Sequence, residues 1–205
     1  MRTIVFWLLV AAATAAAWHR GDSDDFERSS LGSDWSVHNG EIRIFKGNLA
    51  IFAKGLGMVS WARGAVGPDQ FSEAKVADNA APGTVTQVFV RRQTKDGARY
   101  GFHFSPRSPQ QWEIKFDGVP GARTRILGSA EGARGPGPGD TIRLEILGKA
   151  LKGFYNGKEM LSVQDTNDDA ITDGAPGLAF VTPEGATYPA PIFAEWKGGA
   201  LEKRD

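Results

Sequence analysis

The sequence predicts an all-β fold of the sandwich type. Apolar and polar residues alternate over short segments, and turn residues follow these segments at intervals of roughly eight to twelve residues. The chain also carries 26 Gly and 11 Pro among its 205 residues. Period-two alternation is typical of a strand with one buried face, and many short strands joined by tight turns favour a sandwich or a barrel. No segment shows the pattern of an amphipathic helix or of an internal repeat.

The clearest strands form a three-strand meander. Thr141 to Leu147 alternates apolar and polar residues, which predicts a strand with one buried face. Gly148-Lys149 offers a tight turn into a second strand, Leu151 to Tyr155. Asn156-Gly157 suits a two-residue type I′ hairpin turn, which needs positive φ at both positions. Lys158 to Val163 then completes an antiparallel meander.

Two more strands show an expected core face. Between 99 and 104 the aromatic residues occupy alternate positions, and between 112 and 116 Trp112, Ile114 and Phe116 do the same. Asn39-Gly40 predicts another hairpin turn. The remaining expected strands are 41–44, 49–53, 58–61, 71–76, 84–93, 122–127, 177–181 and 192–196. In all, the pattern predicts about thirteen strands.

The ends of the chain divide it into four expected segments. Residues 1–17 have one early charge, a short apolar run and small residues at the end, which together predict a secretory signal peptide. The apolar run is shorter than the roughly 20 residues that a membrane span needs. We expect a flexible lead-in over 18–23, one β-sandwich domain over 24–199 and a polar tail over 200–205. The protein is thus predicted to be secreted or periplasmic, with no membrane span after cleavage.

Composition limits the partners. Lys and Arg total 24 and Asp and Glu total 24, so no net field attracts nucleic acid, and we expect none as a partner. The chain has no Cys, so an exported form must be stabilised by its core without disulfides. One domain of this length can bury a sizeable core.

Several segments in order resemble a concanavalin A-like lectin/glucanase domain, also described as a laminin-G-like jelly roll. They are DDFER, LGSDWSVHNGEIRI, GNLAIF, RRQTKDGARYGFHF, GDTIRLEILGKALKGFYNGKEMLSVQD and DGAPGLAF. The resemblance covers about Asp24 to Gly199. It implies two antiparallel sheets in a jelly-roll sandwich, one of them bent into a concave groove, with the termini paired at one edge. Many such domains bind glycans, and some cleave them.

The catalytic motifs of this superfamily are not found. Its retaining glucanases carry an E-x-D-x-x-E strand, which sets two acids about 5 Å apart, and this sequence has no such strand. The alginate-lyase branch uses Arg, Gln, His and Tyr, which Gln87, Arg91, Arg99, His103 and Tyr155 could supply in kind. That branch's R-x-E-x-R strand and Q-I-H segment are absent. A polysaccharide lyase or glycosidase therefore stays the alternative to a non-catalytic binder.

The polar side of the central strands is the best candidate for a ligand surface. If these strands line the groove, amide, guanidinium and carboxylate groups point into it, and such planar groups suit sugar hydroxyls or uronate carboxylates. The predicted groove residues are Gln87, Arg91, Arg99, His103, Glu113 and Lys115. An ordinary solvated sheet face would show a similar mixture of residues.

Exposed Trp and Tyr rings are the usual platforms for sugar rings. Trp61 lies near a Gly-rich segment and Tyr188 lies in an expected loop, so we predict these two as platforms. Trp35, Trp112 and Trp196 fall within strand periodicity and are predicted to be core.

Two places could hold a structural Ca²⁺, which prefers oxygen ligands. Asp165, Asn167 and Asp169 crowd one expected loop, although an acidic turn with Asx-type caps explains this cluster equally well. The second place follows from the resemblance, since these jelly rolls often hold Ca²⁺ near the paired termini, where Asp24 and Glu195 would contribute.

The sequence thus leaves three classes of function open. The leading hypothesis is a secreted, lectin-like domain that binds a polysaccharide or surface glycan. The second is an enzyme that degrades polysaccharide in the same groove, and the third is an assembly module that associates with itself or with another protein. An enzyme needs an acid or a His with a positioned partner, a binder needs exposed aromatic rings, and an assembly module needs a contiguous apolar patch.

Overall fold

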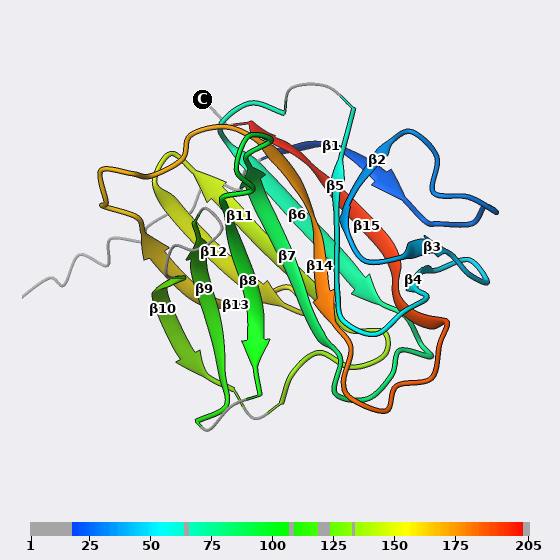
Figure 1. Ribbon diagram of the computed structural model, residues 1–205. Helices are drawn as coiled ribbons and strands as arrows, with labels where there is room; N and C mark the ends of the chain where they lie inside the picture. The colour runs from blue at the N-terminus through cyan, green and yellow to red at the C-terminus, as the bar shows by residue number, and fades with distance from the viewer. Residues whose placement is uncertain (1–17, 64–65, 107–108, 119–123, 133, 203–205) are drawn as a thin grey trace, which may run out of the picture.

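The computed structural model describes residues 18–63, 66–106, 109–118, 124–132 and 134–202. Fifteen antiparallel strands lie in this part of the chain and form two sheets packed face to face (Figure 1). The predicted signal peptide, 1–17, lies outside the described residues. No helix in the described ranges is long and apolar enough to cross a membrane.

Sheet A has eight strands in the order β13-β12-β11-β6-β15-β4-β3, with β1 beside β15. Its strands are β1 (Trp18–Asp24), β3 (Ile42–Ile44), β4 (Leu49–Ile51), β6 (Gln70–Val76), β11 (Thr141–Leu147), β12 (Ala150–Tyr155), β13 (Lys158–Gln164) and β15 (Ala190–Glu202). Sheet B has seven strands in the order β10-β9-β8-β7-β14-β5-β2. Its strands are β2 (Trp35–Asn39), β5 (Leu56–Trp61), β7 (Val85–Arg92), β8 (Arg99–Ser105), β9 (Gln111–Asp117), β10 (Arg125–Glu131) and β14 (Ala175–Val181).

The core fills the space between the two sheets, as the alternation predicts. Trp35, Trp61 and Trp196 pack together with ring centroids 4.8 to 5.2 Å apart. Elsewhere in the core, the ring of Trp112 packs on Phe102 from sheet B at 5.1 Å and on Tyr155 from sheet A at 4.8 Å. Large aromatic side chains therefore bridge the sheets in place of disulfides.

One predicted hairpin is confirmed and one is wrong. Asn156 and Gly157 have φ of 49° and 76°, as a type I′ turn between β12 and β13 requires. The turn at Gly40 instead carries the chain from β2 in sheet B to β3 in sheet A. Gly40 has a φ of 78°, and an added Cβ would lie 2.8 Å from the Leu56 carbonyl oxygen. An Asn-Gly pair therefore forms the turn here too, but the turn connects the two sheets and does not close a hairpin.

The segment predicted as a flexible lead-in is the strand β1. It pairs with β15 over its whole length, from Trp18 opposite Glu202 to Asp24 opposite Trp196. The predicted polar tail is shortened for the same reason, since β15 continues to Glu202. Backbone hydrogen bonds to β15 hold this segment as a strand, although its mostly polar sequence predicts a loop. The first and last strands of the described residues, β1 and β15, therefore pair in sheet A.

Candidate functional site

The outer face of sheet B, turned away from the core, carries a group of polar side chains on five of its strands. We call this group the polar face. Its members are Gln87 and Arg92 on β7, Arg99 and His103 on β8, Glu113, Lys115 and Asp117 on β9, and His38 and Ser60 on β2 and β5. The alternation that turns Tyr100 and Phe102 into the core turns their neighbours outward.

A row of three side chains crosses the middle of the polar face. The strand register places Gln87 opposite His103 and His103 opposite Glu113. His103 Nε2 lies 3.4 Å from Glu113 Oε2, and Gln111 Nε2 donates a hydrogen bond to Glu113 Oε1 at 2.8 Å. The exposed fraction is only 6% for Gln87 and 7% for Glu113. Two of the three side chains of this row are thus buried although they lie on an outer face, and His103 is half-buried.

Glycines beneath this row make room for it. A Cβ added at Gly101 would lie 2.0 Å from Gln87 Nε2, and one at Gly177 would lie 2.5 Å from Phe89 Cζ. The amide and the ring therefore lie directly on the backbone of neighbouring strands. Phe89 joins Met58 and Ala179 in a small apolar cluster, separate from the main core. The polar face consequently has an apolar floor.

Burial and nearby charges set the protonation of the row. Burial, together with the nearby charge of Lys115, lowers the pKa of His103 to about 4. The imidazole is therefore neutral at pH 7. Lys115 Nζ lies 3.4 Å from Asp117 Oδ1, and Arg99 Nη2 lies 2.9 Å from Asp117 Oδ2. One carboxylate thus serves two cations on β8 and β9.

Several hydrogen-bonding atoms of the polar face have no protein partner among the described residues, although they are buried. They are the nitrogen atoms Gln87 Nε2, Arg92 Nε, Arg99 Nε and His103 Nδ1; Asp117 Oδ2 also lacks a hydrogen bond but lies in the ion pair with Arg99. A buried donor or acceptor left without a partner costs roughly 1 to 3 kcal/mol, so such atoms are rare in folded proteins. Four of them on one face mark a surface that is not optimised for stability alone.

Arg91 does not lie on the polar face, contrary to the alternation. Its φ of 52° and a register shift in the pairing of β7 with β14 turn its side chain away. The guanidinium donates to the carbonyl oxygens of Pro68, Ile171 and Gly148 at 2.7 to 2.8 Å. Arg91 is therefore a buried tie between loops. Arg92 takes the outward position instead. The register places it opposite Ala175, and residues that lie opposite one another in antiparallel strands point to the same face of the sheet.

Both predicted aromatic platforms lie elsewhere. Trp61 is a core residue, only 5% exposed, and its indole Nε1 donates to Asp22 Oδ2 at 2.8 Å. The inward positions of β5 include Trp61, which periodicity could have shown. Tyr188 is half-buried, and its hydroxyl forms a hydrogen bond of 2.9 Å with Thr182 Oγ1. Tyr155, considered for lyase chemistry, lies on sheet A and donates its hydroxyl to Asp140 Oδ2 at 2.7 Å.

The carboxylates of the two predicted calcium sites are engaged by protein groups. Asp24 accepts hydrogen bonds from Arg28 and from Trp35 Nε1. Glu195 pairs with Lys75. In the other loop, Asp165 accepts from the Tyr100 hydroxyl and from Asn167, and Asp169 accepts from Arg125. Within the described ranges, no three His, Cys, Asp or Glu side chains converge as metal ligands would. Calcium binding stays an untested prediction.

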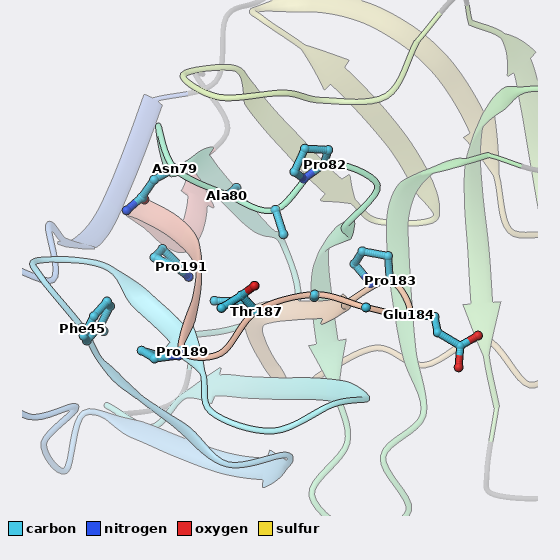
Figure 2. A pocket seen from close by; sticks show the side chains of 13 residues that line it. Phe45, Asn79, Ala80, Pro82, Pro183, Glu184, Thr187, Pro189 and Pro191 are labelled. Atoms are coloured by element: carbon cyan, nitrogen blue, oxygen red, sulfur yellow. The ribbon is translucent and has the colours of Figure 1, made fainter.

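A pocket lies at one end of the sandwich. It measures about 570 Å³ and is formed mainly by the loops at 79–82 and 183–191, with Phe45 at its side (Figure 2). Its wall contains four prolines, and the Glu184 carboxylate pairs with Lys54 instead of entering it. None of the unpaired buried atoms described above belongs to its lining. The polar face therefore carries more of the chemistry that recognises a ligand.

Four members of the polar face were not predicted as site residues from the sequence, namely Arg92, Asp117, His38 and Ser60. Arg92 was missed because period two assigns its neighbour to this face, and nothing in the sequence marks the register shift. His38 was missed because it lies four strands from β8 in the sheet order but more than sixty positions away in the chain. Its Nε2 lies 2.7 Å from Ser60 Oγ.

Comparison with known proteins places the fold. No family model and no curated relative matches the sequence. Among solved structures, the endo-β-1,3-glucanase of Pyrococcus furiosus matches with a TM-score of 0.59 at 11% identity, over 89% of this chain and 94% of the other. The carbohydrate-binding module CBM66 of Bacillus subtilis matches with a TM-score of 0.58 at 11% identity, over 86% and 98%.

A protein of unknown function with a galectin-like fold, also from Bacillus subtilis, matches with a TM-score of 0.60 at 12% identity, over 92% of this chain and 98% of the other. Identities this low establish the architecture alone. Sheet order and comparisons agree that the protein has the jelly-roll sandwich fold of concanavalin A-like lectins and glucanases.

Proposed function

We propose that the protein is a secreted or periplasmic carbohydrate-binding domain whose ligand site is the polar face. One observation carries the proposal: in the row on the outer face, Gln87 and Glu113 are buried and His103 is half-buried, and hydrogen-bonding atoms in and beside the row lack protein partners among the described residues. Structural neighbours that bind or cleave carbohydrate support the choice of ligand. The residues at 1–17 support export.

The chemistry of the row fits sugar hydroxyls. A neutral imidazole has one donor and one acceptor, a primary amide has both, and a carboxylate accepts twice or more. A hydroxyl both donates and accepts, so neighbouring hydroxyls of one sugar can bridge such groups. The binding mode proposed here is polar, because the aromatic ring on this face, Phe89, is fully buried.

The test is a pull-down on insoluble polysaccharides together with a glycan array. Wild type is compared with Glu113→Gln and with His103→Ala, and the control is Glu159→Gln, an exposed carboxylate on sheet A. We expect the first two variants to bind at least roughly tenfold more weakly, because each weakens or removes a hydrogen bond between the row and the sugar. The control should bind as wild type does. Equal loss in all variants, or in none, would contradict the proposal.

An enzyme is the second candidate, and the close approach of His103 and Glu113 favours it. A neutral imidazole beside a carboxylate can act as a general base. Product analysis of every bound polymer separates the two candidates. New reducing ends or unsaturated products that disappear in His103→Ala would establish catalysis, whereas binding without products would establish the binder.

Assembly has less support from the structure. Five large apolar side chains are exposed in the described part of the chain, namely Val37, Leu56, Ile126, Leu147 and Val181. Of these, Leu56 and Val181 are neighbours in register on β5 and β14. Two residues make a patch far below the several hundred Å² that mark an interface.

A further inference from the structure

Positive charge collects at one end of the polar face. Arg92 on β7 and Arg99 on β8 flank the turn between these strands, and Lys115 follows on β9. Arg99 Nη1 donates to the Gly97 carbonyl oxygen at 3.2 Å, and Gly97 also lies against Arg92 Nη2. The two guanidinium groups therefore share one turn. Three cations stand here against the carboxylates Glu113 and Asp117, and the charge of Asp96 in the shared turn acts on Arg92 without forming an ion pair with it in the described residues.

The carboxylates leave Arg92 without an ion pair. Asp117 pairs with both Arg99 and Lys115, and Glu113 faces His103. In the described residues, the hydrogen bond of the Arg92 guanidinium is one from Nη1 to the Gln93 carbonyl oxygen, at 3.3 Å. Its Nε is buried without a partner, as is the Nε of Arg99. Two partly buried guanidinium groups thus have donors to spare.

This arrangement costs stability in the free protein. Burial of a charge without a counterion is unfavourable, and neighbouring like charges add to that cost. Burial, followed by the charge of Arg99, lowers the pKa of Arg92. The pKa of His38 is also lowered, first by partial desolvation of its ring and then by the charges of both arginines. An anion at this point would offset the repulsion between the two arginines and would supply Arg92 with an ion pair.

We propose that Arg92 and Arg99 bind an anionic substituent of the glycan, a carboxylate or a sulfate. The inference rests on the proposed function and narrows the ligand to acidic polysaccharides. A planar guanidinium fork suits carboxylate and sulfate oxygens. The central row Gln87, His103 and Glu113 contacts the hydroxyls of the same ligand, and the arginines select its charge. The ring of Phe89, 5.9 Å from the Arg99 guanidinium carbon, supports the arginine from below.

The test compares polymers that differ in charge alone. Polygalacturonate is paired with its methyl ester, and a sulfated galactan with its desulfated form. We expect the acidic member of at least one pair to bind at least roughly tenfold more tightly than its neutral partner, as one charge-assisted contact implies. Arg92→Gln should remove most of this preference, and Arg92→Lys should keep part of it. The matched control is Arg43→Gln, an exposed arginine on sheet A, which should change nothing.

A second measurement separates failure of this inference from failure of the proposed function. Inorganic sulfate and methyl glucuronide are titrated into the full chain while the arginine Nε–H signals are followed by NMR. Anion-dependent shifts of Arg92 without any polymer binding would support the anion site and overturn the glycan function. Neutral polymers bound as tightly as acidic ones, with Arg92→Gln unchanged, would overturn the inference and leave the function in place. No shift and no binding would overturn both.

Discussion

The two outer faces of the sandwich carry similar residues and treat them differently. On sheet A, Arg143 Nε lies 2.7 Å from Glu145 Oε1, its Nη1 lies 3.3 Å from Glu73 Oε2, and its guanidinium lies over the Phe71 ring. On sheet B, Arg92 has no carboxylate within ion-pair distance in the described residues, although Arg99 lies beside it. Sheet A thus pairs this arginine with two carboxylates, whereas sheet B leaves Arg92 without one within the described ranges.

This difference separates structure from function on two surfaces with the same alternation. Cross-strand pairs of opposite charge are the ordinary way to stabilise an exposed sheet face. Unpaired buried donors work against stability, so their retention points to a second requirement. The polar face is therefore the surface where variants should affect binding more than folding.

The largest expected effect contrasts two neighbouring arginines. Arg91→Ala leaves three carbonyl oxygens without their donor at a position that is 3% exposed. We expect the free energy of unfolding to fall by about 4 kcal/mol. Arg92→Ala should change it by less than about 0.5 kcal/mol, because no ion pair is lost. Urea denaturation of both variants tests this, and similar losses in the two would contradict the contrast.

A smaller effect is expected on the stability of the protein at acidic pH. The pKa of His103 is about 4 in the folded protein and near 6.5 in an unfolded chain. Between these values the unfolded chain binds a proton that the folded protein does not, so stability falls as the pH falls from 6.5 to 4. Linkage gives a loss of about 3 kcal/mol from this residue. His103→Gln should lack this part of the pH dependence.

The comparison for acid is made between wild type and His103→Gln, by urea denaturation at pH 7, 5.5 and 4. Burial opposes the ionised forms of Asp24 and Asp165, but hydrogen bonds and nearby arginines hold their pKa values below the usual range. Protonation of these two carboxylates therefore destabilises both proteins at lower pH. Their contribution cancels in the difference. Parallel curves for the two proteins would show that the imidazole is not kept neutral by the polar face.

Removal of the paired arginine on sheet A should have a moderate effect. Arg143→Gln leaves Glu73 and Glu145 side by side without their shared cation. We expect a loss of about 1 kcal/mol of unfolding free energy and no change in glycan binding. Thermal unfolding and the pull-down measure the two quantities on one preparation. A loss of binding would move the functional surface to sheet A.

The smallest effect belongs to an exposed pair on the same sheet. Lys152 Nζ lies 2.9 Å from Glu159 Oε2, and both side chains are about two-fifths exposed. Lys152→Ala should change the unfolding free energy by less than about 0.5 kcal/mol and leave binding unchanged. A larger change in the melting temperature would mean that surface pairs on sheet A matter more than their exposure suggests.

Period-two alternation predicted the fold well because each strand buries one face. Tyr100, Trp112 and Ile142 lie in the core where the pattern placed them. The pattern also placed Gln87, His103 and Glu113 on one outer face, although residues far apart in the chain supply that face. Local periodicity is sufficient for such residues, because adjacent antiparallel strands align their outward positions.

Features set by long-range pairing escaped prediction. The register shift in β7 exchanges Arg91 for Arg92, and no local signal marks it. The turn at Gly40 joins two sheets because β2 finds β5 as its partner, whereas β3 finds β4. The mostly polar sequence of β1 predicts a loop, and the segment forms a strand because it pairs with β15. In each case the structure of the segment depends on its partner strand, which is distant in sequence.

The most direct test of the account follows the polar face while a glycan binds. In the NMR spectrum, the Gln87 side-chain amide and the His103 ring protons should shift on addition of a polysaccharide retained in the pull-down. The side-chain signals of Lys152 on sheet A and of Phe45 beside the loop pocket should stay in place. Shifts confined to Lys152 or Phe45, with Gln87 and His103 unchanged, would contradict the assignment of the site to sheet B.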